Sequence, residues 1–597
     1  MLAWTCHSLD NTSQVFVPEA SYTGLPGKIE VMRELTLKAA PSFQSGWRRL
    51  RRGLPGFVKG VLRRQAEAWL PNREASAYKL WRATRIAQRA VLYTRDPEPG
   101  LFSVLTAVWN GSPPSYLTQL AELLAAQNRT GACEWVILDN GCTNKALLAC
   151  FEQLEQYPWV RIEHSPQNIG ITRGLRRCLE MATGRYVLPV DADDYLYPDA
   201  LRVITRWIEE TDYPVLLYSD EDKLAGAKFV QPYLKPDWDP VLLLNSAYIA
   251  HLGIVDRLKA LELGAYSDER AEGSPDWDLF VRFLIAGHEG VHIPEVLYGW
   301  RVHAHSTADD AANKPYVQTS QRVVLQRFLD AHPDRAKFAI ENSPLLSGAA
   351  HWRFVRAAGL PCPPIATVPV RAGASNVPPR DLLPMAQQLA ARDGLIRFAS
   401  DALQPDDFDW AAEAVGIFEL HPDTVMVGGR IRNSRGYITE AGVHFGVGEI
   451  CASPHAGRPV LDPGYFTHIW KQRSVSAVSV QFAVVKAAFL QDLLQQIPSA
   501  ASLPFLGAWA GAYAMKTGQR VVYSPYLSGV SDVQWNASVS DSEVQLFADR
   551  YREIIPDRRY YSCGLSLAEP FALGEMPALK FSGQPEAAYH QRAAKNA

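Results

Sequence analysis

The chain has 597 residues, of which 47% are hydrophobic and 21% are charged, so it is long enough for two or three domains and has a folded protein's composition. Its formal net charge of -3 excludes recruitment of nucleic acid by overall charge. The eight cysteines form no CxxC pair, which favours a reducing compartment over a disulfide scaffold. We therefore expect a multidomain cytoplasmic protein with no nucleic-acid partner.

Residues 1–98 are predicted to form a basic, partly helical N-terminal region. No apolar run approaches the roughly 18 residues that a membrane-spanning helix needs. Residues 45–69 mix arginines and a lysine with aromatic and aliphatic side chains, a pattern that suits contact with anionic lipid headgroups. The alternative is a solvated helix packed on its own domain, and Gly53, Pro55 and Gly56 weaken a continuous helix in either case.

Turn-forming residues at 96–100 predict a linker, and alternating strand and helix patterns follow it. Strands are expected at 102–108, 135–138, 160–162 and 186–190. Helices are expected at 116–127, in a stretch after 141 that ends at about residue 157, and at 170–182. This alternation predicts an α/β fold with a mostly parallel sheet. Ligands bind beyond the carboxyl ends of such strands, where Asn110, Asp139 and Asp191 fall.

The chain changes character beyond about residue 344, where a proline-rich stretch precedes a second α/β pattern. We expect a first α/β domain at 99–335, a second at 345–560 and a C-terminal tail at 561–597.

Three carboxylates, Asp191, Asp193 and Asp194, directly follow a predicted buried strand. Crowded hard oxygen ligands suit Mg²⁺ or Mn²⁺, which can bridge a nucleotide diphosphate. An acidic triplet after a strand is equally typical of a helix cap or a solvated turn. Taken alone, the motif leaves both interpretations open.

Eight ordered motifs between residues 101 and 307 resolve this ambiguity. They are Thr106-Ala-Val-Trp-Asn110, Ile137-Leu-Asp-Asn-Gly141, Gln167-Asn-Ile-Gly170, Ala182-Thr-Gly-Arg-Tyr-Val-Leu-Pro-Val-Asp-Ala-Asp-Asp194, Tyr218-Ser-Asp-Glu-Asp222, Lys235-Pro-Asp-Trp-Asp-Pro240, Ser274-Pro-Asp-Trp-Asp-Leu279 and Val296-Leu-Tyr-Gly-Trp-Arg-Val-His303. In order and spacing, the series resembles the family-2 inverting glycosyltransferases of GT-A fold. The resemblance implies a GT-A domain that uses a nucleotide-diphosphate sugar and a divalent metal.

The resemblance also implies roles for individual residues. The nucleotide sugar would meet Ala107, Asn110, Asp139, Asn140, Asn168, Asp191 and Ala192. The metal, Mn²⁺ or Mg²⁺, would be bound by Asp193 and His303, with His305 as a competitor. Asp276 would be the catalytic base, and an N-cap is its alternative role. The expected acceptor site comprises Asp220, Glu221, Asp222, Trp238, His251 and Asp278, with Arg282 in a supporting position.

Two departures from the family pattern affect the nucleotide site. The family more often has Pro-Val-Tyr-Asn and Asp-Asp-Gly-Ser where this chain has Ala107-Val-Trp-Asn110 and Asp139-Asn-Gly-Cys142. The identity of the nucleotide therefore stays open. For Trp109, core packing and a contact with the base are both open.

The region 345–560 resembles the later half of the same fold without its catalytic parts. Ala399-Ser-Asp-Ala402 stands where an acidic motif would be, and Leu506-Gly-Ala-Trp-Ala-Gly511 stands where the base would be. We expect a degenerate, reduced GT-A-like domain with a structural or acceptor-binding role. The alternative is a domain that binds a sugar nucleotide without metal.

The leading expectation is an inverting, metal-dependent transferase that extends a polysaccharide or lipid-linked glycan, such as an O-antigen or capsule chain. It would work in the cytoplasm, at the inner face of the cell membrane, beside polysaccharide-assembly partners. The alternative is a noncatalytic glycan-binding or scaffolding protein of such an assembly. A sugar-nucleotide nucleotidyltransferase needs a basic phosphate loop, and Asn110-Gly-Ser-Pro-Pro114 contains no basic residue.

Overall fold

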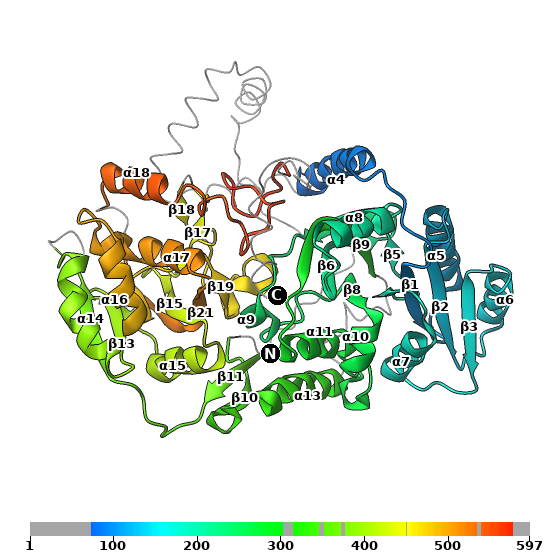
Figure 1. The fold of residues 1–597 in the computed structure, drawn as a ribbon, viewed down its shortest axis with the longest axis horizontal. Coiled ribbons are helices and arrows are strands. Elements are labelled where there is room, and N and C mark those ends of the chain that lie inside the picture. The colour runs from blue at the N-terminus through cyan, green and yellow to red at the C-terminus, as the bar shows by residue number, and fades with distance from the viewer. Residues whose placement is uncertain are drawn as a thin grey trace, which may run out of the picture.

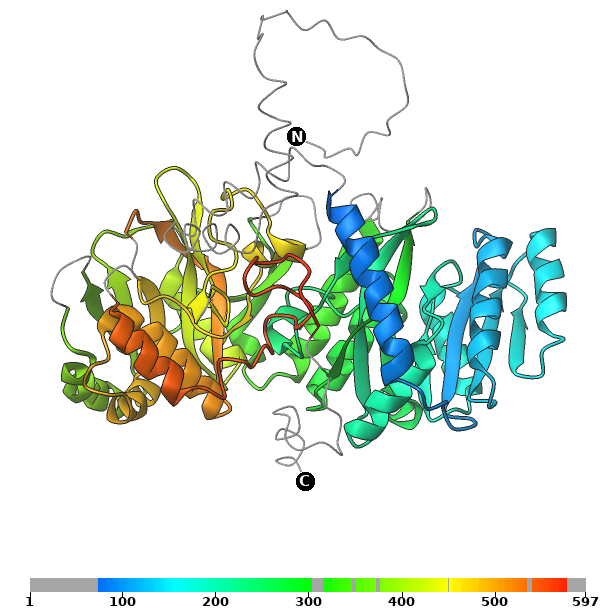
Figure 2. The ribbon, with the colours of Figure 1, turned by 90° about the horizontal axis from the view of Figure 1, so that it is seen from above.

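The computed structural model describes residues 73–302, 315–345, 351–371, 376–448, 450–533 and 539–576. Two α/β lobes lie side by side along the long axis of the molecule, and helix α4 (Arg73–Leu92) lies against the first lobe (Figure 1, Figure 2). Among these residues, no helix is long and apolar enough to cross a membrane. The predicted lipid-contact segment 45–69 lies outside the described residues.

The first lobe is built on a sheet with the strand order β3-β2-β1-β4-β8-β6-β9-β5, and β7 pairs with β6. Its strands are β1 (Phe102–Val108), β2 (Cys133–Asn140), β3 (Val160–Ser165), β4 (Tyr186–Pro189), β5 (Tyr195–Leu196), β6 (Leu216–Ala225), β7 (Lys228–Tyr233), β8 (Gly253–Asp256) and β9 (Val291–Val302). Strands β3, β2, β1 and β4 are parallel, as are β6 and β9, while β8 is inserted antiparallel. The predicted α/β fold with a mostly parallel sheet is confirmed.

Helices cover both faces of this sheet because side chains alternate along its strands. Val104 on β1 packs into one core with α5 (Pro114–Gln127), α6 (Lys145–Leu154) and α8 (Ala200–Glu210). Its neighbour Leu105 packs into the opposite core with α7 (Ile171–Met181), α10 (Arg257–Glu262), α11 (Pro275–Ile285) and α13 (Pro315–Ala331). The carboxyl ends of β1, β2 and β4 therefore meet at one edge between two packed layers.

The second lobe follows an antiparallel hairpin, β10 (Phe338–Asn342) and β11 (Trp352–Arg356). Its sheet has the order β12-β13-β20-β15-β21-β14, and β16 pairs with β15. The strands are β12 (Ile365–Val370), β13 (Leu395–Ser400), β14 (Gln404–Pro405), β15 (Thr424–Arg432), β16 (Ile438–Ala441), β20 (Phe482–Lys486) and β21 (Arg520–Val530), with β17 (His444–Phe445), β18 (Cys451–Ala452) and β19 (Arg473–Val475) beside them. Its helices are α14 (Leu383–Ala390), α15 (Trp410–Leu420), α16 (Ala487–Gln496), α17 (Leu506–Lys516) and α18 (Asp541–Arg550).

The second sheet repeats the first from β1 onward. Strands β12, β13, β20, β15, β21 and β14 occur in the same order and relative directions as β1, β4, β8, β6, β9 and β5. Within the described ranges, β2 and β3 have no counterparts beside β12. The second lobe is therefore an α/β lobe that shares the strand order of the first from β1 onward.

The chain after α18 packs between the two lobes, where the sequence led us to expect a tail from residue 561 (Figure 2). Tyr561 and Leu565 are buried in the core that also contains Val447 of the second lobe and Leu297 of the first. These apolar side chains therefore join the lobes into one body.

Helix α4 is held to the first lobe by buried polar contacts. The guanidinium of Arg85 pairs with Glu295 on β9, and Arg89 pairs with Asp199 at the start of α8. The hydroxyl of Tyr78 donates to Asp222 at 2.5 Å. The N-terminal region therefore covers β6, and Asp222 lies beneath it with no exposed surface.

Asp222 gives the stability of this docking a dependence on pH. Burial raises the pKa of its carboxyl to about 7, against opposing hydrogen bonds from Tyr197 and Tyr78. In the unfolded chain the Asp222 carboxyl has a pKa of about 4. The stability that this group contributes to the folded state is therefore complete below pH 4 and is lost as the pH rises through 7. The side chain of the Asp222→Asn variant cannot ionise. The free energy of unfolding of this variant, taken relative to that of the wild type, should therefore rise by at least about 1 kcal/mol from pH 5 to pH 8.

Urea unfolding at both pH values measures this difference. The control is Asp549→Asn, which changes an exposed carboxylate on α18. In this variant, the free energy of unfolding should differ between the two pH values by as much as it does in the wild type. A constant gap between Asp222→Asn and the wild type at both pH values would contradict the assignment.

Candidate active site

The edge beyond β1 and β2 is shaped by side chains that bind loop backbone. The side-chain Oδ1 of Asn110 accepts from the backbone N–H of Thr143 and of Asn144, at 2.7 and 3.0 Å. Asn140 accepts from the N–H of Ile169 at 2.7 Å and donates to Gly170 O at 3.1 Å. The predicted nucleotide-side residues thus lie together, and these two fix the loops around the site.

Asp139 is 4% exposed and fully engaged. One carboxylate oxygen accepts from the Cys142 N–H at 2.8 Å, and the other lies 2.9 Å from Nδ1 of His164 on β3. The Asp139 hydrogen bond is the main cause that raises the pKa of His164. His164 was not predicted from the sequence, since only the pairing of β2 with β3 places it opposite Asp139.

The outer rim of this edge of the sheet is lined by Trp109, Asn168 and Ala107. Trp109 is 53% exposed, which excludes core packing, and its ring lies over Gly111. Asn168 is exposed and accepts from the Gly170 N–H at 2.8 Å. Ala107 is half-buried, and its methyl faces the position of a Cβ on Gly174 in α7.

The acidic loop after β4 is attached to the end of β9. Asp194 is 2% exposed, and its carboxylate accepts from the Tyr298 hydroxyl at 2.6 Å and the Arg301 N–H at 2.7 Å. The Arg301 guanidinium donates to Asp193 O at 2.6 Å. Tyr298 and Arg301 belong to the sequence motif at 296–303, but the sequence predicted no role for either. Their bonds fix the acidic loop against β9.

Asp191, Asp194 and His251 form the group best arranged to bind a cation. One ligand atom from each lies within 4.8 Å of the other two. The His251 ring stacks on Tyr298, with 4.7 Å between centroids. Asp193, the residue predicted as a metal ligand, is half-buried on the same loop, next to buried Ala192. His303 and its competitor His305 lie outside the described residues.

Asp276 faces this group from the first turn of α11. Ser274 occupies the N-cap position and Pro275 follows it, so Asp276 is not the cap. Burial raises the pKa of Asp276 to about 7. Asp191 is exposed, but the protein around it still raises its pKa to about 6. His251 opposes this rise and the charge of Asp276 adds to it. An exposed and a half-buried carboxylate from separate elements therefore lie close enough for their charges to interact.

The residues predicted to bind an acceptor lie mostly inside the protein. Asp220 accepts from the Lys235 N–H at 2.7 Å and from His292 at 2.8 Å, and Asp222 lies under α4. Trp238 is 7% exposed in the core. Asp278 is 1% exposed and is bound by Arg282 at 2.6 Å and Arg327 at 2.7 Å.

Two predicted acceptor residues lie closer to the centre. Glu221, 9% exposed, accepts from the N–H of His251 at 3.2 Å, and His251 itself is half-buried beside Asp191. Of the six predicted acceptor residues, His251 is therefore the one placed at the acidic loop. The carboxylates of Asp220, Asp222 and Asp278 bind protein groups instead, because helices and loops remote in sequence cover them.

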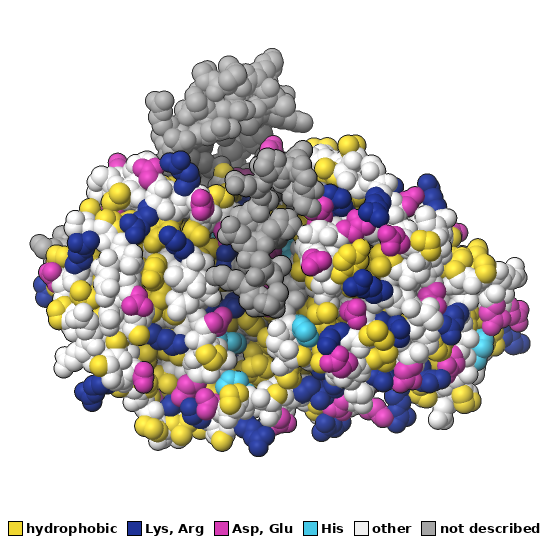
Figure 3. All heavy atoms as spheres, in the orientation of Figure 1, with side chains coloured by type: hydrophobic (Ala, Val, Ile, Leu, Met, Phe, Trp, Pro, Cys, Tyr) yellow, Lys and Arg dark blue, Asp and Glu magenta, His cyan; other side chains and the backbone are white. Residues whose placement is uncertain are grey.

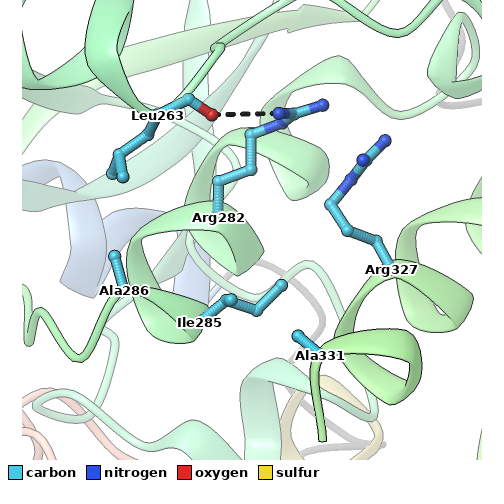
Figure 4. A pocket seen from close by; sticks show the side chains of 6 residues that line it. All are labelled: Leu263, Arg282, Ile285, Ala286, Arg327 and Ala331. Atoms are coloured by element: carbon cyan, nitrogen blue, oxygen red, sulfur yellow. Dashed lines mark hydrogen bonds between the residues drawn. The ribbon is translucent and has the colours of Figure 1, made fainter.

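A shallow cavity of about 210 Å³ lies on the far half of α11, lined by Arg282, Arg327 and the apolar side chains of Leu263, Ile285, Ala286 and Ala331 (Figure 4). Asp278 forms ion pairs with both arginines, and Asp268 forms a second ion pair with Arg327. On the surface, acidic and basic side chains are interspersed over the face shown in Figure 3.

The equivalent place in the second lobe is closed. Ser400-Asp-Ala-Leu403 precedes β14, where Asp191-Ala-Asp-Asp194 precedes β5, and Gly507 is the second residue of α17, as Asp276 is of α11. A Cβ on Gly507 would lie 1.9 Å from Val478 O, and one on Gly511 2.1 Å from Ser476 O. Backbone of residues 476–478 therefore occupies the place that a side chain equivalent to Asp276 would need.

Sheet order and the acidic loop after β4 define the first lobe as a GT-A fold. Residues 103–224 match the family model described as "Glycosyl transferase family 2", so this segment is a domain of that family.

Two relatives and one solved structure show how far the similarity extends. An uncharacterized protein, y4gI, of Sinorhizobium fredii is 26% identical over 476 residues, covering 70% of this chain and 50% of that protein. The O-antigen biosynthesis protein RfbC of Myxococcus xanthus is 27% identical over 41% of this chain and 18% of its own length. The structure of S. aureus TarS 1-349 in complex with UDP-GlcNAc aligns with 39% of this chain and 68% of that chain, at 21% identity and a TM-score of 0.34. The chain thus spans half or less of these two relatives.

The close approach of two site loops at Gly141 can be tested. Its φ is +70°, and a Cβ there would lie 2.4 Å from the backbone carbon of Gln167. Gly226 has φ +60° with nothing near its Cβ position, so Ala at 226 isolates the left-handed strain. We expect Gly141→Ala to lower the free energy of unfolding by at least about 1 kcal/mol more than Gly226→Ala in urea titrations. Equal losses would mean that the loops are not in contact.

Proposed function

We propose that this protein is an inverting glycosyltransferase, which moves a sugar from a nucleotide-diphosphate donor to a growing polysaccharide or lipid-linked glycan of O-antigen or capsule type. The observation that supports this most is that Asp276, on α11, lies within electrostatic reach of Asp191, on the loop after β4. The family-2 match over residues 103–224 covers the half of the lobe that carries Asp191.

Asp276 is the proposed base. Inversion needs one carboxylate that takes the proton of the acceptor hydroxyl while its oxygen attacks the anomeric carbon and the nucleotide leaves from the opposite face. Burial places the pKa of Asp276 at about 7, close to the value at which a base both accepts a proton and is largely ionised near neutral pH. Pro275 and the first turn of α11 fix its direction.

The donor set fits a divalent cation. Carboxylate oxygens of Asp191 and Asp194 with an imidazole nitrogen of His251 are ligands that Mn²⁺ accepts, and Mg²⁺ accepts the carboxylates. When bound, the cation would neutralise charge on the nucleotide diphosphate. Asp193 and His303 are the further ligands that the family resemblance implies. Tyr298 and Arg301 hold Asp194 in place for this role.

The proposed donor side is the edge beyond β1 and β2. Exposed Trp109 offers a flat apolar face to a nucleotide base, and Asn110 and Asn140 fix the loops that flank it. Work at the inner face of the cell membrane, contact through residues 45–69 and association with polysaccharide-assembly partners are proposed from the sequence.

Asp276→Asn should lower kcat about a thousandfold, because the amide cannot accept the proton. Nucleotide affinity should stay within twofold, since Asp276 serves the acceptor. Transfer from a panel of nucleotide sugars with Mn²⁺, followed by calorimetry with the nucleotide alone, checks both. A variant with more than a tenth of the wild-type kcat would refute the role of Asp276. If the wild type binds no nucleotide diphosphate with metal, the glycan-binding scaffold becomes the better reading.

Metal binding can be measured without any sugar donor. Asp191→Asn and His251→Ala should each weaken Mn²⁺ binding at least tenfold in calorimetry, because each removes one of three converging ligands. His288→Ala, a half-buried histidine on the same lobe, is the control. Asp193→Ala separates the two ligand sets: a loss as large as that of Asp191→Asn would place Asp193 in the coordination sphere. Unchanged affinity in all variants would refute the metal site.

A further inference from the structure

Lys235 is a completely buried cation beside the proposed active site. Its ammonium donates to Ser219 O at 2.9 Å, Ile249 O at 2.5 Å and His251 O, and it pairs with Glu221 at 3.1 Å. The same Glu221 oxygen accepts from the His251 N–H at 3.2 Å. Lys235 and Glu221 therefore hold His251 by both its backbone groups.

This arrangement tolerates little displacement. A buried ammonium that loses its acceptors is strongly destabilised, so Lys235 and the backbone around His251 must move together or not at all. The His251 ring, stacked on Tyr298 and converging with Asp191 and Asp194, takes its position from this backbone. The location of Lys235 thus decides where the imidazole lies.

The second lobe holds the residues that flank Lys235. The Tyr465 hydroxyl accepts from the Leu234 N–H at 2.9 Å and donates to Leu234 O at 3.2 Å. The Tyr233 ring stacks on Phe466 with 3.8 Å between centroids.

The same contact continues along the chain after Lys235. The Asp239 carboxylate accepts from the Ser474 N–H at 2.8 Å and from its hydroxyl at 2.7 Å. Asn245 donates to Gln472 at 3.1 Å, and Lys471 donates to the Ser246 hydroxyl at 2.8 Å. The whole segment 233–246 is therefore bound on one side by the second lobe and, through Lys235, joined on the other to His251.

We infer that the second lobe is a clamp for the catalytic lobe, and that Lys235 is the positioning residue through which it sets His251. This role rests on the proposed transferase function. Of the structural and acceptor-binding roles expected from the sequence, it specifies the structural one, because it needs no ligand on the second lobe.

Removing one hydroxyl from the second lobe tests the clamp. Lys235→Met would strand Glu221 in the core, so Tyr465→Phe is the milder change, and it deletes both bonds to Leu234. Tyr523→Phe is the matched control, because its hydroxyl donates to Ile469 O at 2.7 Å within the second lobe. Two readouts are used: amide hydrogen exchange of peptides covering 247–256 without substrate, and kcat with the best donor.

Tyr465→Phe should speed exchange in 247–256 at least tenfold and lower kcat at least fivefold, with the KM for the donor changed less than twofold. Tyr523→Phe should leave both readouts near wild type at a similar loss of thermal stability. Unchanged exchange and kcat in Tyr465→Phe, or equal changes in both variants, would overturn the clamp. If exchange responds as expected while the wild type transfers no sugar, the clamp stands and the transferase proposal fails.

Discussion

The burial of the Lys235 ammonium constrains much of the first lobe. A charge with no exposed surface requires a full set of acceptors, and here they come from β6 and from the loop before β8. The middle of strand β6 must therefore lie beside that loop, and the loop must present two carbonyl groups to the Lys235 ammonium. His251 belongs to the same loop. The need of the buried Lys235 ammonium for acceptors thus determines where the His251 imidazole lies beside the acidic loop after β4.

Burial raises the pKa of several carboxyl groups at the acidic loop. Asp194 is held by hydrogen bonds from Tyr298 and the Arg301 backbone N–H, and burial nevertheless raises its pKa well above the ordinary value. For Asp276, burial alone raises the pKa, and for Asp191 it is the largest cause. Displacement of water by the surrounding protein is thus the largest cause of the raised pKa in all three groups.

Hydrophobic periodicity was sufficient to predict β1, β2 and β4 and the edge where Asn110, Asp139 and Asp191 gather, because parallel strands end together. Burial of Asp222 was not predictable from its neighbours in sequence, since it is covered by Tyr78 on α4, 144 residues away. The convergence of His251 with Asp191 likewise depends on the pairing of β8 with β4, and His164 reaches Asp139 only through the pairing of β3 with β2. Local patterns identify residue types, whereas tertiary contacts assign their roles.

The second lobe keeps the sheet order of the first but not its open edge. Gly507 and Gly511 let α17 approach the backbone of residues 476–478 so closely that side chains there would overlap it. The polar and aromatic residues of the second lobe between 465 and 474 instead meet segment 233–246 of the first lobe. Leu234 and Lys235 link this interface to His251, because Tyr465 is hydrogen-bonded to Leu234 and the Lys235 ammonium donates to the His251 carbonyl oxygen.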